Sequence, residues 1–97
     1  MYKQLFLLKK SGDEQVRKHF DEFILKHLSR ITGNEIKSGK VESNLLLEQK
    51  YDACCEVTFK DKQEMDKMMN SEAGRELNKD LFDFHKHIDI ITINYNN

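Results

Sequence analysis

Residues 51–84, YDACCEVTFKDKQEMDKMMNSEAGRELNKDLFDF, decide the expected fold, because three elements with clear start signals follow one another there. Apolar and polar side chains alternate along Tyr51–Phe59, which predicts a strand with one buried face. Asp61 followed by Glu64 is a variant of the capping box and predicts the start of a short helix. Ser71 can cap a second, longer helix.

Each of these elements has an apolar side. The strand face that we expect to be buried carries Ala53, Cys55, Val57 and Phe59. The apolar side of the short helix consists of Met65, Met68 and Met69. Methionines of this kind are more typical of a core, although the soft wall of a pocket would look the same. The longer helix has an apolar side at helical spacing, formed by Ala73, Leu77, Leu81 and Phe84.

The rest of the chain supplies a further helix and three strands. Tyr2–Lys9 and Ile88–Tyr95 are strand-like, with apolar residues on both faces. Residues 13–30 predict a helix that stops at Gly33 and Asn34. Its apolar stripe consists of Val16, Phe20, Phe23, Ile24, Leu28 and Ile31. Residues 35–48 predict a second strand with a break near Ser38 and Gly39, and its apolar positions are Ile36, Val41, Leu45, Leu46 and Leu47.

The expected order is strand, helix, strand, strand, helix in two pieces, strand. This βαββαβ order is that of the ferredoxin-like α+β fold with an antiparallel sheet, and we expect residues 1–97 to form one domain. The helices can cover only one face of the sheet, while the first and last strands also carry apolar residues on the other. Because such a patch marks a partner surface, we expect a two-fold symmetric homodimer with its sheets face to face.

The composition is that of a globular protein, with 38% hydrophobic and 34% charged residues and a net charge of −1. Lys and Arg are scattered among Asp and Glu, which argues against a nucleic-acid surface. No apolar run approaches the roughly 20 residues that span a bilayer. The adjacent Cys54 and Cys55 would point to opposite faces of a strand, so we expect reduced thiols and a cytoplasmic location.

The second half of the chain resembles the EthD-like branch of the dimeric α+β barrel proteins. That family tends to carry a Tyr-Asp at the start of the third strand, an acidic residue and an aromatic residue near its end, a Ser at a helix start, a small-residue and Gly pair, and an Asp four residues before a Phe. The matching positions are Tyr51, Asp52, Glu56, Phe59, Ser71, Glu72, Gly74, Asp80 and Phe84. The element order extends the resemblance over nearly the whole chain.

The first helix departs from the family pattern, which is often a His-Trp pair followed by a second His four residues after the Trp. Here His19 keeps the first position, Phe20 replaces the Trp, and Ile24 stands at the second His position. The wider superfamily includes cofactor-free monooxygenases, lactone isomerases, haem-degrading enzymes and stress proteins. The resemblance therefore implies the dimeric α+β barrel and does not select a reaction.

His27 is the candidate acid or base, because its position on the helix lies within the apolar stripe and could face a cavity between the first helix and the sheet. The structural alternative is a core histidine whose ring nitrogens have internal partners. The candidate ligand-binding residues around such a pocket are His19, Tyr51, Glu56, Met68 and Met69. We expect no metal site, since the cations of residues 85–89 suit the end of a helix better than a ligand set.

The function expected from these observations is the binding of a small apolar organic molecule by a cytoplasmic homodimer. If the protein is an enzyme, the chemistry would be oxygenation or isomerisation without a cofactor. The alternative is a ligand-binding or stress-related protein of the same fold that has no catalytic activity. The sequence leaves the choice between the two open.

Overall fold

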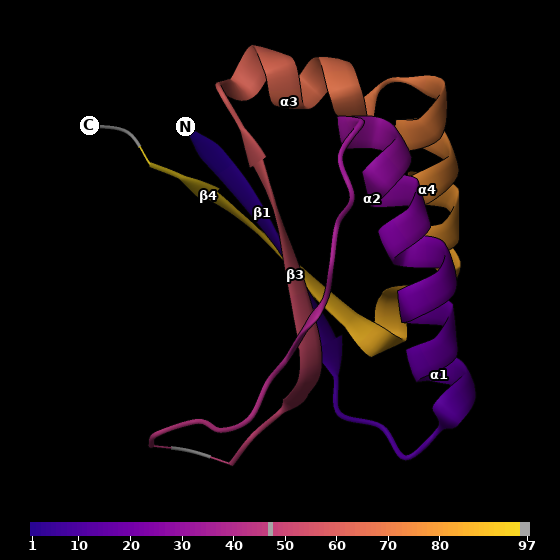
Figure 1. Cartoon of the computed structure of the whole chain (residues 1–97), viewed down its shortest axis with the longest axis vertical. Coiled ribbons are helices and arrows are strands. Elements are labelled where there is room, and N and C mark those ends of the chain that lie inside the picture. Colours follow the sequence, from indigo (N-terminus) through magenta and orange to yellow (C-terminus); the bar gives the residue numbers. More distant parts are fainter. Residues whose placement is uncertain (47, 96–97) are drawn as a thin grey trace.

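The computed structural model describes residues 1–46 and 48–95. Strands and helices follow one another in the expected order, and the second helical region is in two pieces (Figure 1). The elements are β1 (Tyr2–Lys9), α1 (Glu14–His19), the π-helical segment η1 (Phe20–Ile24), α2 (Leu25–Thr32), β2 (Gly39–Lys40), β3 (Tyr51–Phe59), α3 (Lys62–Met69), α4 (Glu72–Phe84), the 3-10 turn η2 (His85–His87) and β4 (Ile88–Asn94).

The four strands form one sheet in the order β2-β3-β1-β4, and all neighbours are antiparallel. The helices lie on one side of this sheet, with α3 crossing near one end (Figure 1). This arrangement is a mixed α+β structure of the ferredoxin-like type, as the sequence predicted. The long central strands β1 and β3 pair along almost their whole length, so they form the floor on which the helices pack.

Side chains cap the helix starts, and Asp61 and Ser71 do so as the sequence predicted. The Asp13 side chain accepts a hydrogen bond from the backbone N–H of Gln15, and Asp61 accepts one from that of Glu64. Ser71 accepts one from the backbone N–H of Gly74. These side chains satisfy N–H groups that a helix leaves without a partner in its first turn.

The core lies between the helices and the sheet. Its largest fully buried side chains come from both layers, and they are Phe6, Leu8, Phe20, Ile24, Leu28, Phe59 and Leu77. Every one of them is at most 1% exposed, so close-packed side chains fill the space between the first helical region and the sheet.

One turn of the first helical region is wider than an α-helical turn. The backbone N–H of Leu25 bonds to the carbonyl of Phe20, five residues earlier, instead of four. A π turn of this kind takes up one extra residue. As a result Phe20, Ile24 and Leu28 all face the sheet at a spacing of four, while Phe23 is 50% exposed. The predicted stripe is wrong for Phe23 and is confirmed for its other members, which are buried: Val16, Phe20, Ile24, Leu28 and Ile31.

The second strand is much shorter than expected. Only Gly39 and Lys40 pair with β3, and the chain then swings away from the helical layer (Figure 1). Leu45 and Leu46, which were predicted to be strand residues, are 96% and 91% exposed. The predicted run also included Leu47, which lies outside the described residues.

The sheet face opposite the helices is open in the single chain. Strand register places Leu5 of β1 between Glu56 of β3 and Ile91 of β4 on this face. Leu5 is half-buried and Ile91 is 44% exposed. We call this surface the open face; its apolar side chains are Leu5, Leu7, Ile91 and Ile93.

Candidate functional site

Two histidines and one carboxylate meet where the first helical region packs against α4. The His19 Nε2 atom lies 2.7 Å from Asp80 Oδ1. The His27 Nε2 atom lies 3.7 Å from Asp80 Oδ2. The side chains of His27 and Asp80 are each 19% exposed, and that of His19 is 33% exposed. We call these three residues the His–Asp–His cluster.

The π turn explains why both histidines face the same carboxylate. His19 and His27 are eight residues apart, which on a regular α-helix would separate their directions by about 80°. Because η1 takes up one extra residue between them, the spacing is equivalent to about seven residues, or nearly two full turns. Both side chains therefore lie on the side of the helix that faces α4.

Aromatic rings surround the His19 imidazole. It stacks on Phe23, with ring centroids 5.0 Å apart and planes inclined by 27°. It also contacts Phe84, at 4.9 Å between centroids. Phe84 is buried and Phe23 is half-exposed, so the imidazole bridges the core and the surface. These contacts and the bond to Asp80 hold the ring in one orientation.

A surface hollow of about 440 Å³ borders the cluster at His19. We call it the helix hollow; it is lined by Gln15, Lys18, His19, Glu22 and Phe23. Its lining combines one aromatic wall, cationic and anionic side chains, and the imidazole. The size and the mixed lining suit a small organic molecule with a polar group.

The bond between His19 and Asp80 has a chemical consequence. When a carboxylate accepts a hydrogen bond from one nitrogen of a neutral imidazole, the other nitrogen carries the lone pair that can take a proton. Nε2 faces Asp80, so this nitrogen is Nδ1 of His19, and no described residue is hydrogen-bonded to it. The carboxylate would also stabilise the positive charge that a protonated ring carries.

The part of the cluster formed by His27 and the second oxygen of Asp80 lacks hydrogen bonds. His27 Nδ1 and Asp80 Oδ2 are both buried, and neither has a hydrogen-bond partner among the residues that the structure describes. At 3.7 Å, the contact of His27 with Asp80 is longer than a hydrogen bond. His27 therefore differs from the structural alternative of a core histidine with satisfied nitrogens. It also does not line the helix hollow.

The other expected site residues lie apart from the cluster. The Tyr51 hydroxyl donates a hydrogen bond to Asp89 Oδ2 over 2.7 Å at one end of the sheet. Glu56 is on the open face, with Lys3 Nζ at 3.5 Å, and its side chain is 57% exposed. Met68 and Met69 pack against the core from α3. The structure thus brings together His19 and His27 and separates them from the remaining four.

The sequence indicated Asp80 only as a match to the family pattern and not as a candidate site residue. It matched the family pattern as a position four residues before Phe84, and its contact with His19 spans 61 residues of sequence. A signal was present, because His19 and Asp80 both matched that pattern. Periodicity alone could not indicate that the two positions face each other.

Two observations concern other kinds of site. Within residues 1–46 and 48–95, no group of three or more His, Cys, Asp or Glu side chains is arranged to hold a metal ion. In the same part of the chain, no helix combines the length and apolarity that crossing a membrane requires.

Comparisons with known proteins give the family. Residues 10–86 match the model of the EthD domain. A crystal structure of an EthD family protein from Bacillus halodurans C-125 superposes with a TM-score of 0.80 at 20% identity, and the match covers 99% of each chain. No curated protein matches the chain.

The fold also resembles that of the Arabidopsis thaliana protein At3g17210. Its crystal structure gives a TM-score of 0.61 at 21% identity, covering 100% of this chain and 95% of that one. Its solution structure, described as that of a hypothetical protein, gives 0.54 at 21% identity, with 99% and 87% covered. These structural likenesses concern the fold. The match of the EthD domain model over residues 10–86 shows that the chain belongs to the EthD family.

Proposed function

We propose that the protein binds a small organic molecule in the helix hollow and moves a proton on it through His19. One observation carries the proposal: the 2.7 Å contact between His19 Nε2 and Asp80 Oδ1 at the border of a hollow of about 440 Å³. A histidine oriented by a carboxylate is a common general base in enzymes. Asp80 acts here as the positioning residue.

The proposed step needs no cofactor. His19 Nδ1 removes a proton from a C–H bond next to a carbonyl group, and the electron pair of that bond becomes an enolate. The imidazolium formed is stabilised by Asp80 and returns the proton to the substrate. Lys18 lines the same hollow, and its ammonium group can stabilise the developing negative charge on the enolate oxygen. Return of the proton to a different atom gives an isomerisation.

The second candidate is a ligand-binding protein of the same fold without catalytic activity. It is favoured by the close-packed interior, since the space between the first helical region and the sheet is filled by side chains with at most 1% exposure. A bound molecule would then lie at the surface in the helix hollow. His19 and Lys18 would serve as hydrogen-bond donors to it.

Deuterium exchange separates the two candidates. Small ketones such as phenylacetone would be incubated with the protein in heavy water, and loss of the C–H signal next to the carbonyl would be followed by NMR. We expect His19→Gln to slow the exchange by at least about a hundredfold, the usual contribution of a positioned base. Asp80→Asn should slow it to a smaller extent.

His85→Gln is the matched control, because His85 is an exposed histidine on η2 whose Nδ1 faces the carbonyl of Phe82. It should exchange at the wild-type rate. Equal exchange in wild type and His19→Gln would reject the proposed base. Ketone binding that shifts the His19 ring signals without any exchange would support the second candidate.

We further propose that two copies associate through their open faces. The supporting observations are the apolar side chains of this face, of which Ile91 is 44% exposed, and the nearly complete exposure of Leu45 and Leu46. A second copy with the same surface would cover both, as in a two-fold symmetric dimer. Apolar surface of this kind in a chain of 97 residues also favours association, because a small domain buries little on its own.

A further inference from the structure

Asp80 faces two histidines, and its two oxygens are engaged unequally. Its Oδ1 atom lies 2.7 Å from His19 Nε2, whereas its Oδ2 atom lies 3.7 Å from His27 Nε2. Oδ2 is buried and accepts no hydrogen bond from any described residue. Such an oxygen is costly, because burial removes its water without supplying a donor. The nitrogen that faces this oxygen is His27 Nε2, so His27 is the residue that can satisfy it.

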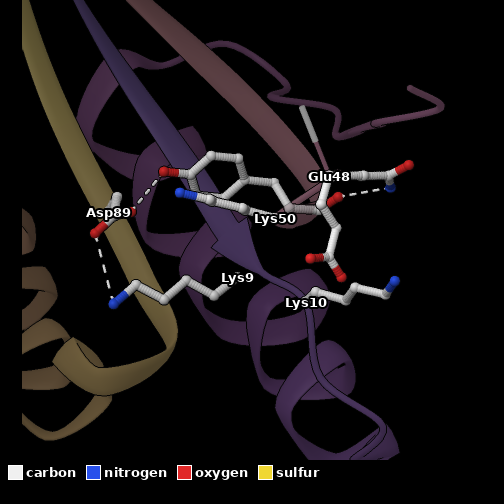
Figure 2. Close-up of a pocket in the computed structure, with 7 residues that line it drawn as sticks. Lys9, Lys10, Glu48, Lys50 and Asp89 are labelled. Carbon is white, nitrogen blue, oxygen red and sulfur yellow. Dashed lines mark hydrogen bonds and ion pairs between the residues drawn. The ribbon is translucent and has the colours of Figure 1, made fainter. Parts of the chain in front are cut away.

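Asp89 provides a comparison within the same molecule. It lines a hollow of about 360 Å³ at one end of the sheet (Figure 2). One oxygen of Asp89 accepts a hydrogen bond from the Tyr51 hydroxyl over 2.7 Å, and the other lies 3.7 Å from Lys9 Nζ. Both carboxylates therefore have one short and one longer contact. The Asp89 side chain is 40% exposed and that of Asp80 only 19%, so Asp80 depends more on donors from the protein.

The packing of α2 on α4 fixes the place of His27 beside Asp80. About one turn further along both helices, Arg30 Nη1 lies 2.8 Å from Glu76 Oε2, which sets the register of the two helices. The contact of His27 Nε2 with Asp80 Oδ2 exceeds the usual upper limit for an N–H···O bond by about 0.5 Å. A small rotation of either side chain is enough to close that gap.

The charge of Asp80 selects one tautomer of neutral His27. With the hydrogen on Nε2, the N–H dipole points at the carboxylate, whereas with the hydrogen on Nδ1 a lone pair would face the carboxylate and be repelled. The hydrogen is therefore on Nε2. The Nδ1 atom is buried, and His27 does not line the helix hollow. His27 is thus placed to donate to Asp80 and not to act on a substrate.

We infer that His27 is a second positioning residue, which holds Oδ2 of Asp80 through its Nε2–H and so fixes the carboxylate that orients His19. A carboxylate held at one oxygen alone can turn about its Cβ–Cγ bond, and its hydrogen bond to His19 weakens when it turns. Held at both oxygens, it keeps the His19 ring in place with Nδ1 free for the substrate. The catalytic consequence rests on the proposed function, but the effect on the His19 ring does not need a substrate.

The ring N–H proton of His19 reports this effect. A hydrogen-bonded imidazole N–H exchanges slowly with water and gives its own proton NMR signal at low temperature, and loss of that signal in His19→Gln would assign it. His27→Leu removes the donor and keeps a side chain of moderate size. His27→Gln is the conservative variant, because an amide N–H at the end of that side chain can reach Asp80 Oδ2.

We expect the ring proton of His19 to exchange with water at least about tenfold faster in His27→Leu, the effect of losing a hydrogen bond to a charged group. In His27→Gln it should stay close to wild type. Deuterium exchange of phenylacetone should follow the same order. His27→Leu should lower kcat with little change in KM, because the base is displaced while binding in the helix hollow is kept.

Two further variants complete the comparison. Lys26→Leu changes the exposed neighbour of His27 on α2, and it should behave like wild type in both measurements. His27→Asn has an amide that is too short to reach Oδ2, so it should resemble His27→Leu although its side chain is polar. Thermal unfolding of each variant would show that it is folded at the temperature of the measurement.

The inference would be overturned if the His19 ring proton were unchanged in His27→Leu and His27→Asn, since Asp80 would then hold His19 by itself. Equally fast exchange in His27→Gln and His27→Leu would also overturn it, because the effect would come from packing and not from the N–H donor. A wild-type protein that exchanges no deuterium into phenylacetone would reject the proposed base alone. The ring-proton comparison would still decide the role of His27.

Discussion

His19 Nε2 lies 2.7 Å from Asp80 Oδ1, which joins the end of α1 to the middle of α4 across 61 residues of sequence. A second contact between the same helical layers, from Arg30 to Glu76 at 2.8 Å, is exposed to solvent. Exposed ion pairs contribute little to stability, whereas a partly buried hydrogen bond with one charged partner contributes more. The His19–Asp80 contact therefore joins the two helical regions, and it also orients His19, the proposed base.

Asp80→Ala should lower the free energy of unfolding by about 1–2 kcal/mol, because it leaves His19 and His27 without their carboxylate in a partly buried place. Urea denaturation followed by circular dichroism would measure the change. Asp83→Ala is the matched control on the same helix, since Asp83 is exposed. Equal losses in the two variants would show that the His19–Asp80 contact does not stabilise the fold.

Gly74→Ala should destabilise the protein by about 1–3 kcal/mol, the usual effect of overpacking. A Cβ atom at this position would clash with the backbone carbonyl of Met69 and would lie 2.7 Å from the carbonyl oxygen of Met68. The clash outweighs the gain in helix propensity, which is about 1 kcal/mol. Thermal unfolding would measure it. Gly12→Ala, which meets nothing within 4 Å, should leave the melting temperature almost unchanged.

The Cys55 thiol should make stability depend on pH in the alkaline range. Burial, and the nearby Cys54, raise the pKa of Cys55 from 9.0 to about 12. Between these values the unfolded chain has lost a proton that the folded chain keeps, so the free energy of unfolding falls as pH rises. The slope from this one group is at most about 1.4 kcal/mol per pH unit.

Urea denaturation at pH 8, 9 and 10 would measure that slope in wild type and in Cys55→Ala, which lacks the group. The variant should lose less stability over the range, although it starts lower because of the smaller side chain. Parallel curves for the two proteins would contradict the assignment. Val57→Ala is the control, since it shortens a buried side chain on the same face of β3 without removing a thiol, and it should follow the wild-type slope.

Ile91→Lys should dissociate the proposed dimer, because it sets a charge in the middle of the open face. Ile91 is 44% exposed in the single chain, so the variant should still fold. Sedimentation at micromolar concentration should give a dimer for wild type and a monomer for Ile91→Lys. Phe82→Lys changes a residue of α4 that is 78% exposed, and it should remain dimeric. A monomeric wild type would reject the dimer.

The elements with strong local signals were predictable from the sequence. The strand Tyr51–Phe59 has the bounds that its alternation predicted, and Asp61 and Ser71 cap the helices that they were expected to start. In these places side-chain alternation and capping chemistry act within a few residues of sequence. Tertiary contacts did not need to be known.

Other features depend on contacts that no local pattern reveals. The exposure of Phe23 and the common direction of His19 and His27 both follow from one wide turn, whereas a helical wheel assumes a constant 100° per residue. The apolar residues Leu45 and Leu46 look like a buried strand in sequence, yet no described part of the single chain covers them. The pairing of Asp80 with His19 needed the packing of α4 on the first helical region.

The π turn also determines where the chain can change length without losing its site. Because Phe20–Ile24 holds one residue more than an α-helical turn needs, a deletion of one residue there would leave a continuous α-helix. His19 and the residue that is now His27 would then be seven positions apart, nearly two turns, and would still face α4. Deletion of Lys26 in α2 would also remove one residue between the two histidines. The extra residue of η1 would compensate for this loss. The first helical region thus carries a built-in tolerance to the loss of a single residue, located between its two histidines.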